Sequence, residues 1–150
     1  IMFIGEGPGY NEDRMGRPFV GKAGQLLDKM IQSIGLSREE VYIANIVKCR
    51  PPENRNPYEE ESKICIEYLR WQVKIIYPDI IVCLGAIASR NIISPDFKVT
   101  SERGIWVKKG NFYIMPTYHP AALLRDESKK KGAWEDFKSI RAKYEEILKA

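Results

Sequence analysis

The chain has 150 residues, of which 44% are hydrophobic and 29% are charged, which suits one compact globular domain spanning residues 1–150. No apolar run approaches the roughly 20 residues that a membrane span needs and no signal-peptide pattern opens the chain, so we expect a cytoplasmic protein. The formal net charge of +4 is compatible with a polyanionic partner, although many proteins that bind none carry a similar charge.

Four apolar segments are predicted to be strands: Ile1–Ile4, Val41–Val47, Ile80–Leu84 and Phe112–Thr117. The first three are nearly continuous apolar runs, which is typical of strands buried on both faces of a parallel sheet. Because such a strand is normally preceded by other residues, we expect the protein to have residues upstream of Ile1.

Helical patterns separate these strands. Apolar residues between Leu26 and Ile34 share one face and stop at Gly35, a suitable C-cap, and residues 37–40 resemble a capping box. Two longer helices are expected over residues 58–77 and 134–148. Their predicted apolar stripes consist of Ile64, Tyr68, Leu69, Trp71, Ile75 and Ile76 in the first helix, and Phe137, Ile140, Tyr144 and Ile147 in the second.

Residues 105–108 and 112–115 form a predicted hairpin around Lys109-Gly110-Asn111. Since strands and helices alternate, the predicted fold class is α/β, with three α/β/α layers around a central, mostly parallel four-stranded sheet. In sheets of this kind, ligands bind beyond the carboxyl ends of the strands. The candidate functional segments are therefore those that follow Ile4, Val47, Leu84 and Thr117.

The first of these segments is Gly5-Glu6-Gly7-Pro8-Gly9. Its glycines allow the backbone to pass close to a ligand and expose its amides, but the segment is neither a Walker sequence nor a dinucleotide-binding fingerprint. A glycine-rich turn with a solvated Glu6 is an equally good interpretation. In the next loop, Phe19 is either a core residue or a stacking platform for a planar ring.

Two polar residues mark the ends of later strands. Asn45 interrupts an apolar run, and because a buried amide costs free energy unless it is paired, it is either a satisfied structural residue or an amide directed at a base edge. His119 is the only histidine, and the proline that follows it favours an extended loop residue with a short helix from Pro120. A lone histidine is usually structural, but at the carboxyl end of a sheet it is a candidate catalytic group.

Four segments, taken together, resemble the family-four uracil-DNA glycosylases, the thermostable iron–sulfur type. The matching residues are 5–9 (GEGPG), 16–24 (GRPFVGKAG), 45–55 (NIVKCRPPENR) and 119–125 (HPAALLR). They follow the family's order over nearly the whole chain, each at or just after a predicted strand end. The resemblance implies an enzyme that flips uracil out of DNA and hydrolyses its N-glycosidic bond in base excision repair. It would act as a monomer on single- or double-stranded DNA.

The resemblance also implies how the base is held. Phe19 would stack on the flipped uracil, and Asn45 would read the uracil edge and reject cytosine. His119 would hydrogen-bond uracil O2 as negative charge develops there. The turn of Glu6, Gly7 and Pro8 would border the base and the attacking water.

The water-activating group and the DNA contacts are assigned next. Better-known relatives carry an aspartate before the proline of the first turn, where this chain has Gly7, so we assign electrostatic support to Glu6 with Asn54 assisting. Leu123 matches the wedge that enters the minor groove and fills the vacated stack, and Arg125 is expected to contact the DNA beside it.

The three cysteines, an odd number, argue against a disulfide framework. Cys83 lies in an apolar strand, where a small buried side chain is expected. By resemblance, Cys49 and Cys65 match two of the four thiolates that hold a [4Fe–4S] cluster in the family. The other two would belong to a Cys-x-x-Cys segment upstream of Ile1, because two thiolates cannot complete the site. No catalytic metal is expected.

Three other interpretations compete with this one. A related branch traps its product through a histidine on an inserted loop, but this chain has only His119. A non-catalytic DNA-binding domain, like the glycosylase-related segments of phage-type DNA polymerases, would keep the fold but could lose His119 or Asn45. A nucleotide-binding domain would use residues 5–9 on phosphate, yet that turn has no lysine.

Overall fold

The computed structural model describes residues 1–6, 21–46 and 59–150, with the backbone alone for residues 59–65. Five strands form one sheet in the order β2-β1-β3-β5-β4. Their bounds are β1 (Met2–Gly5), β2 (Tyr42–Asn45), β3 (Ile80–Leu84), β4 (Val107–Lys109) and β5 (Phe112–Thr117). The four predicted strands are mutually parallel, which confirms the mostly parallel sheet.

The fifth strand is where the sheet differs from the prediction of four strands. It is β4, the first arm of the predicted hairpin, which pairs antiparallel with β5 from Val107↔Ile114 to Lys109↔Phe112. The turn between them is possible because Gly110 adopts a φ of +56°, a region that favours glycine. β4 is an edge strand, and its short length and its two exposed lysines discourage pairing with a further strand.

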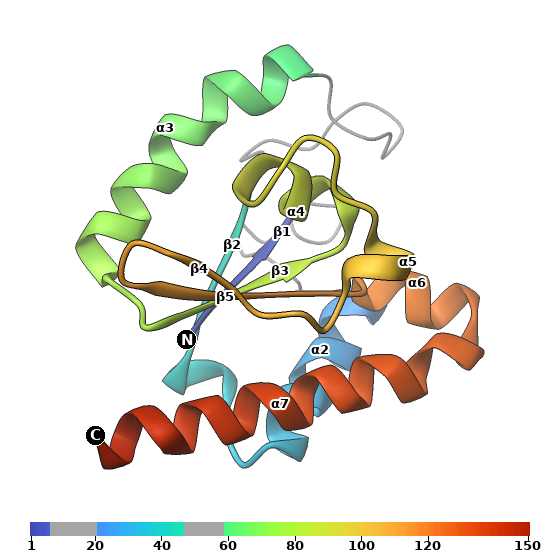
Figure 1. Ribbon diagram of the computed structural model, residues 1–150. Coiled ribbons are helices and arrows are strands. Elements are labelled where there is room, and N and C mark those ends of the chain that lie inside the picture. The colour runs from blue at the N-terminus through green and yellow to red at the C-terminus, as the bar shows by residue number, and fades with distance from the viewer. Residues whose placement is uncertain (7–20, 47–58) are drawn as a thin grey trace.

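Helices cover both faces of the sheet, which confirms the three-layer α/β/α architecture (Figure 1). On one face α2 (Lys22–Ser33) and α7 (Lys130–Lys149) pack over Phe3, Val82 and Met115. On the other face α3 (Glu59–Ile76) and α4 (Ala86–Ile92) pack over alternate residues, among them Ile4 and Cys83. Because side chains alternate along a strand, burial on both faces explains the continuous apolar runs in the sequence.

The ends of the first predicted helix are formed as expected. The backbone N–H of Gly35, at φ +78°, donates to Gln32 O, and that of Leu36 donates to Ile31 O, which is the Schellman pattern that ends α2. In the capping box, the Ser37 backbone N–H donates to Glu40 Oε1 at 3.1 Å and opens the 3₁₀ helix η1 (Arg38–Glu40).

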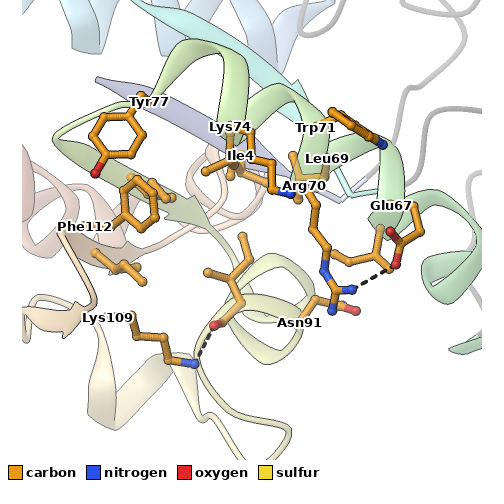
Figure 2. A pocket seen from close by; sticks show the side chains of 15 residues that line it. Ile4, Glu67, Leu69, Arg70, Trp71, Lys74, Tyr77, Asn91, Lys109 and Phe112 are labelled. Carbon is orange, nitrogen blue, oxygen red and sulfur yellow. Dashed lines mark hydrogen bonds and ion pairs between the residues drawn. The ribbon is translucent and has the colours of Figure 1, made fainter.

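The predicted apolar stripe of α3 is right for Leu69, which is 3% exposed, but wrong for Tyr68, Trp71 and Ile75. Tyr68, Trp71 and Ile75 are 64%, 61% and 79% exposed, whereas the packed side carries Ile66, Leu69 and Val73. Both triplets repeat at helical spacing, so the helix has two apolar stripes, and periodicity alone did not separate the buried one from the exposed one. Between α3 and the sheet lies a hollow of about 720 Å³, bordered by Phe112 of β5 (Figure 2).

The C-terminal helix α7 begins four residues before the predicted start and buries the expected Phe137 and Ile140. The ring of Phe137 stacks on that of Phe3 at a centroid distance of 5.9 Å, which ties α7 to the first strand. Three short helices complete the described chain: α5 (Val99–Glu102), α6 (Pro120–Arg125) and η3 (Glu127–Lys129). Among the described residues, no helix has the length and apolarity needed to cross a membrane.

Candidate active site

A cavity of about 290 Å³ lies at the carboxyl ends of three parallel strands, where the topology predicts a ligand site. Glu6 reaches it from the end of β1, Gly85 from the end of β3, and Tyr118 and His119 from the end of β5. Residues that are more than a hundred positions apart in the sequence therefore line one space. The larger hollow under α3 lies elsewhere, between that helix and the sheet.

His119 is held by the helix that it starts. It is extended (φ −69°, ψ 140°) and forms the N-cap of α6, with Pro120 in the first turn, as predicted. Its Nδ1 accepts a hydrogen bond from the backbone N–H of Ala121 at 3.0 Å. Because Nδ1 is the acceptor, the neutral imidazole carries its proton on Nε2, so the ring is fixed in the tautomer whose Nε2 is a hydrogen-bond donor.

Gly85 allows β3 to approach His119, and sequence analysis did not single it out. It adopts φ +94° and ψ 177°, and a Cβ there would lie 3.0 Å from the Cβ of His119. Its backbone N–H donates to Thr117 O at 2.9 Å and so joins the ends of β3 and β5. Both the backbone conformation and the close approach require glycine. The signal in the sequence was a glycine directly after a buried strand.

Glu6, at the end of β1, is half-buried where it lines the cavity. Burial raises the pKa of its carboxyl group, and the positive charge of Arg125 opposes that rise. Arg90 and Lys129 also line the cavity, so three cations from α4, α6 and η3 surround the one carboxylate among its described lining residues. The opening therefore has a net positive charge suited to an anionic ligand.

Two other predicted residues are described but are not among those that line the cavity. Asn45 ends β2 opposite Gly5 in the parallel register and is 6% exposed. Leu123, expected as an exposed wedge, is 1% exposed and lies against Leu26 and Trp134 in a shallow pocket where α6 meets α2 and α7. Its neighbour Leu124 is 47% exposed.

The remaining predicted residues lie outside the described residues. They are Gly7, Pro8, Phe19, Cys49 and Asn54, and for Cys65 the structure describes only its place in α3. No group of three or more His, Cys, Asp or Glu side chains in the described part could hold a metal ion. The third cysteine, Cys83, is fully buried in the apolar core, and burial raises the pKa of its thiol to about 12, so it does not suit a thiolate ligand. The described residues alone therefore do not fit a four-thiolate cluster.

A family model described as the uracil DNA glycosylase superfamily matches residues 1–138. The chain therefore belongs to the uracil DNA glycosylase superfamily, as the four matching sequence segments led us to expect.

Two relatives place it more narrowly. The chain is 50% identical over 150 residues to the type-4 uracil-DNA glycosylase of Sulfurisphaera tokodaii, a match that covers 94% of this chain and 68% of that protein. It is 48% identical over 132 residues to the type-4 uracil-DNA glycosylase of Thermotoga maritima, covering 85% of this chain and 68% of that protein. The resemblance to family-four enzymes is thus confirmed, and the chain is placed in the type-4 branch.

A third match concerns the non-catalytic alternative. The chain is 32% identical over 126 residues to the DNA polymerase of Bacillus phage SP01, which covers 83% of this chain and 14% of that protein. Since the type-4 glycosylases are considerably more similar, this relationship does not favour a polymerase-associated role.

Proposed function

We propose that this chain is a uracil-DNA glycosylase that flips uracil out of DNA and hydrolyses its N-glycosidic bond, leaving an abasic site for base excision repair. Residues 1–150 would form one catalytic domain that acts as a cytoplasmic monomer. The observation that carries the proposal is the strand-end cavity in which His119 is held as an Nε2 donor, in a chain about half identical to type-4 glycosylases.

In the reaction, the bond between C1′ of the deoxyribose and N1 of uracil breaks, and its electron pair stays with the base. Negative charge then develops on uracil O2, while the sugar becomes oxocarbenium-like. A donor aimed at O2 binds more strongly as that charge grows, which is stabilisation of the transition state over the ground state. His119 is our candidate, because its fixed tautomer supplies a donor without a net charge on the ring.

The base must leave the duplex before it can react, at a cost of a few kcal/mol. Stacking on Phe19 would return about 1–3 kcal/mol. Asn45 would pair with the uracil edge, since its amide offers a donor and an acceptor together. The turn of Gly7 and Pro8 would close the pocket on the side of the attacking water.

Water adds to C1′ and releases one proton, which balances the negative charge of the departing uracil, so that neutral uracil and an abasic sugar are the products. We assign electrostatic support of the oxocarbenium-like sugar to the Glu6 carboxylate, with Asn54 orienting the water. The half-buried position of Glu6 supports this role, because a charge acts more strongly where water is partly excluded.

The cationic rim of the cavity would hold the DNA backbone. Arg125, Arg90 and Lys129 all line the cavity, and their positive charges would bind the phosphates on either side of an extruded nucleotide. A wedge would then fill the gap in the stack. Leu123 could serve only after leaving the core, whereas Leu124 is already exposed on the same helix.

We further propose that Cys49 and Cys65 supply two of the four thiolates of a [4Fe–4S] cluster in the full-length protein. No step of the reaction needs the cluster. A colourless full-length protein without bound iron would contradict this assignment.

The decisive experiment incubates the full-length protein with a single uracil-containing oligonucleotide and then cleaves abasic sites with alkali. Strand scission at the uracil supports the proposal, and a thymine-containing duplex of the same sequence is the control. If the protein bound the oligonucleotide without scission, the non-catalytic DNA-binding alternative would replace it.

A further inference from the structure

A buried carboxylate lies behind the active site and has no role in the proposed reaction. Asp136 of α7 is 3% exposed and is the only charged side chain among the buried polar residues of the described chain. Its Oδ2 accepts a hydrogen bond from Thr117 Oγ1 at 2.6 Å, and its Oδ1 accepts one from an Arg103 NH group at 2.7 Å. Burial raises the pKa of Asp136, and the contacts with Thr117 and Arg103 oppose that rise.

Arg103 also contacts Gly132 and Tyr118. The same guanidinium nitrogen donates to Gly132 O at 3.2 Å, and the guanidinium carbon lies 5.5 Å from the centre of the Tyr118 ring. The ammonium group of Lys129 lies at the same distance from that ring. Tyr118 is therefore held near two cations.

Two glycines leave room for this ion pair. A Cβ at Gly104 would lie 2.6 Å from Asp136 Oδ1, and a Cβ at Gly132 would lie 2.8 Å from the guanidinium carbon of Arg103. Gly104 also donates its backbone N–H to Pro116 O at 2.8 Å. The backbone on both sides is thus shaped around the Asp136–Arg103 pair.

These contacts converge on the two residues that precede His119. Thr117 is bound through its hydroxyl to α7 and through its carbonyl oxygen to the N–H of Gly85. Tyr118 is held by Arg103. A buried ion pair adds little net stability compared with apolar residues of similar size. We therefore expect the contacts of Asp136 and Arg103 to determine the position of the end of β5 more than the stability of the fold.

We propose that Asp136 is a positioning residue, which sets the location of the His119 imidazole in the cavity by fixing Thr117 directly and Tyr118 through Arg103. The inference rests on the proposed function for its effect on excision, but the position of the ring is a property of the protein alone. A displacement of about 1 Å at a reacting group can lower a rate by roughly a hundredfold, so an indirect contact of this kind has a measurable effect.

The test compares Thr117→Val and Asp136→Asn with two controls. Thr117→Val removes the hydroxyl that Asp136 binds, and Thr117→Ser restores it. Asp28→Asn removes the carboxylate of another ion pair, Arg38–Asp28 at 3.1 Å, which joins α2 to η1 away from the cavity. All variants are assayed as full-length protein, and excision is measured in single turnover under conditions where the protein is folded by circular dichroism.

We expect Thr117→Val and Asp136→Asn to lower the excision rate constant at least tenfold, with the Kd for DNA changed less than threefold. Thr117→Ser and Asp28→Asn should stay within threefold of wild type in both. If Asp136→Asn does not fold, Thr117→Val still decides the question. Wild-type excision rates in both Thr117→Val and folded Asp136→Asn would overturn the proposal.

A second measurement separates this inference from the proposed function. His119 is the only histidine in residues 1–150, and its ring resonances in the full-length protein are identified in a proton–nitrogen spectrum by their loss in His119→Ala. Its Nε2 signal should shift or broaden in Thr117→Val and Asp136→Asn but not in Asp28→Asn. If wild-type protein did not excise uracil, the proposed function would fail while this spectrum still tested the positioning. Unchanged ring signals in both Thr117→Val and Asp136→Asn would refute the positioning role of Asp136.

Discussion

Replacing His119 removes a helix cap and a hydrogen-bond donor together, and two variants can separate these losses. His119→Ala loses both. His119→Asn keeps a side chain that is among the best N-caps but lacks the imidazole. Because Nδ1 caps α6 through Ala121 while Nε2 carries the proton, the two nitrogens have different tasks, and the variants should differ in stability but not in activity.

The two effects have different sizes. Loss of an N-cap costs about 1 kcal/mol, so His119→Ala should lower the free energy of unfolding by about that amount, while His119→Asn stays close to wild type. Loss of one donor to a developing oxyanion costs about 2.7–4 kcal/mol of transition-state stabilisation, or roughly 10²–10³ in rate. Both variants should therefore excise uracil about 10²–10³ times more slowly than wild type.

Single-turnover excision from a uracil-containing oligonucleotide gives the rate constants, and urea unfolding gives the stabilities. Excision by His119→Ala at the wild-type rate would refute the oxyanion argument. Equal stability of His119→Ala and His119→Asn would instead show that the Nδ1 contact does not cap the helix.

Four further predictions concern the surroundings of this residue. Asn45→Ala should slow uracil excision about 10- to 100-fold, corresponding to a lost paired amide of about 1–3 kcal/mol, as measured in single turnover. Burial raises the pKa of Glu6 in the folded protein, so ionisation of this carboxyl group destabilises the fold as the pH rises from the unfolded-state pKa through the folded-state pKa. Glu6→Gln should therefore melt at a higher temperature than wild type at pH 8, where Glu6 is ionised. At pH 3, where it is protonated, the two proteins should melt at the same temperature. Gly85→Ala should lose about 1–3 kcal/mol of stability through its positive φ and should slow excision by displacing His119, whereas Gly110→Ala, where a Cβ meets nothing within 4 Å, should leave the rate unchanged. Cys83→Ala should cost about 1 kcal/mol of stability and leave the excision rate unchanged. Because the Cys83 thiol is buried, the native variant and the native wild type should have the same number of thiols that react with a disulfide reagent.

The sequence predicts those parts of the fold that depend on local patterns. Continuous apolar runs identified the parallel strands because both faces of this sheet are covered. The ends of α2 and η1 were predictable since Gly35 and the capping box act within a few residues. The position of His119 beyond β5 was predictable because the proline that follows restricts its backbone.

Contacts between distant segments were not predictable in the same way. The two apolar stripes of α3 have equal periodicity, and only tertiary packing decides that Leu69 is buried and Trp71 is not. Leu123 and Leu124 are neighbours of identical type, and the rotation of a short helix decides which of them is exposed. The contact of Asp136 with Thr117 joins α7 to β5, and no local feature of α7 indicates it.

The strand order places the first strand in the interior of the sheet, between β2 and β3. Because Glu6 lies near the start of the sequence and His119 near its end, a nascent chain carries Glu6 long before β5 and His119 have left the ribosome. The cavity is completed only once the last strand has joined β3, and α7 must still fold over both. A product terminated before His119 would hold Glu6 but no imidazole, so such translation errors would yield inert fragments and not enzymes that create abasic sites without control.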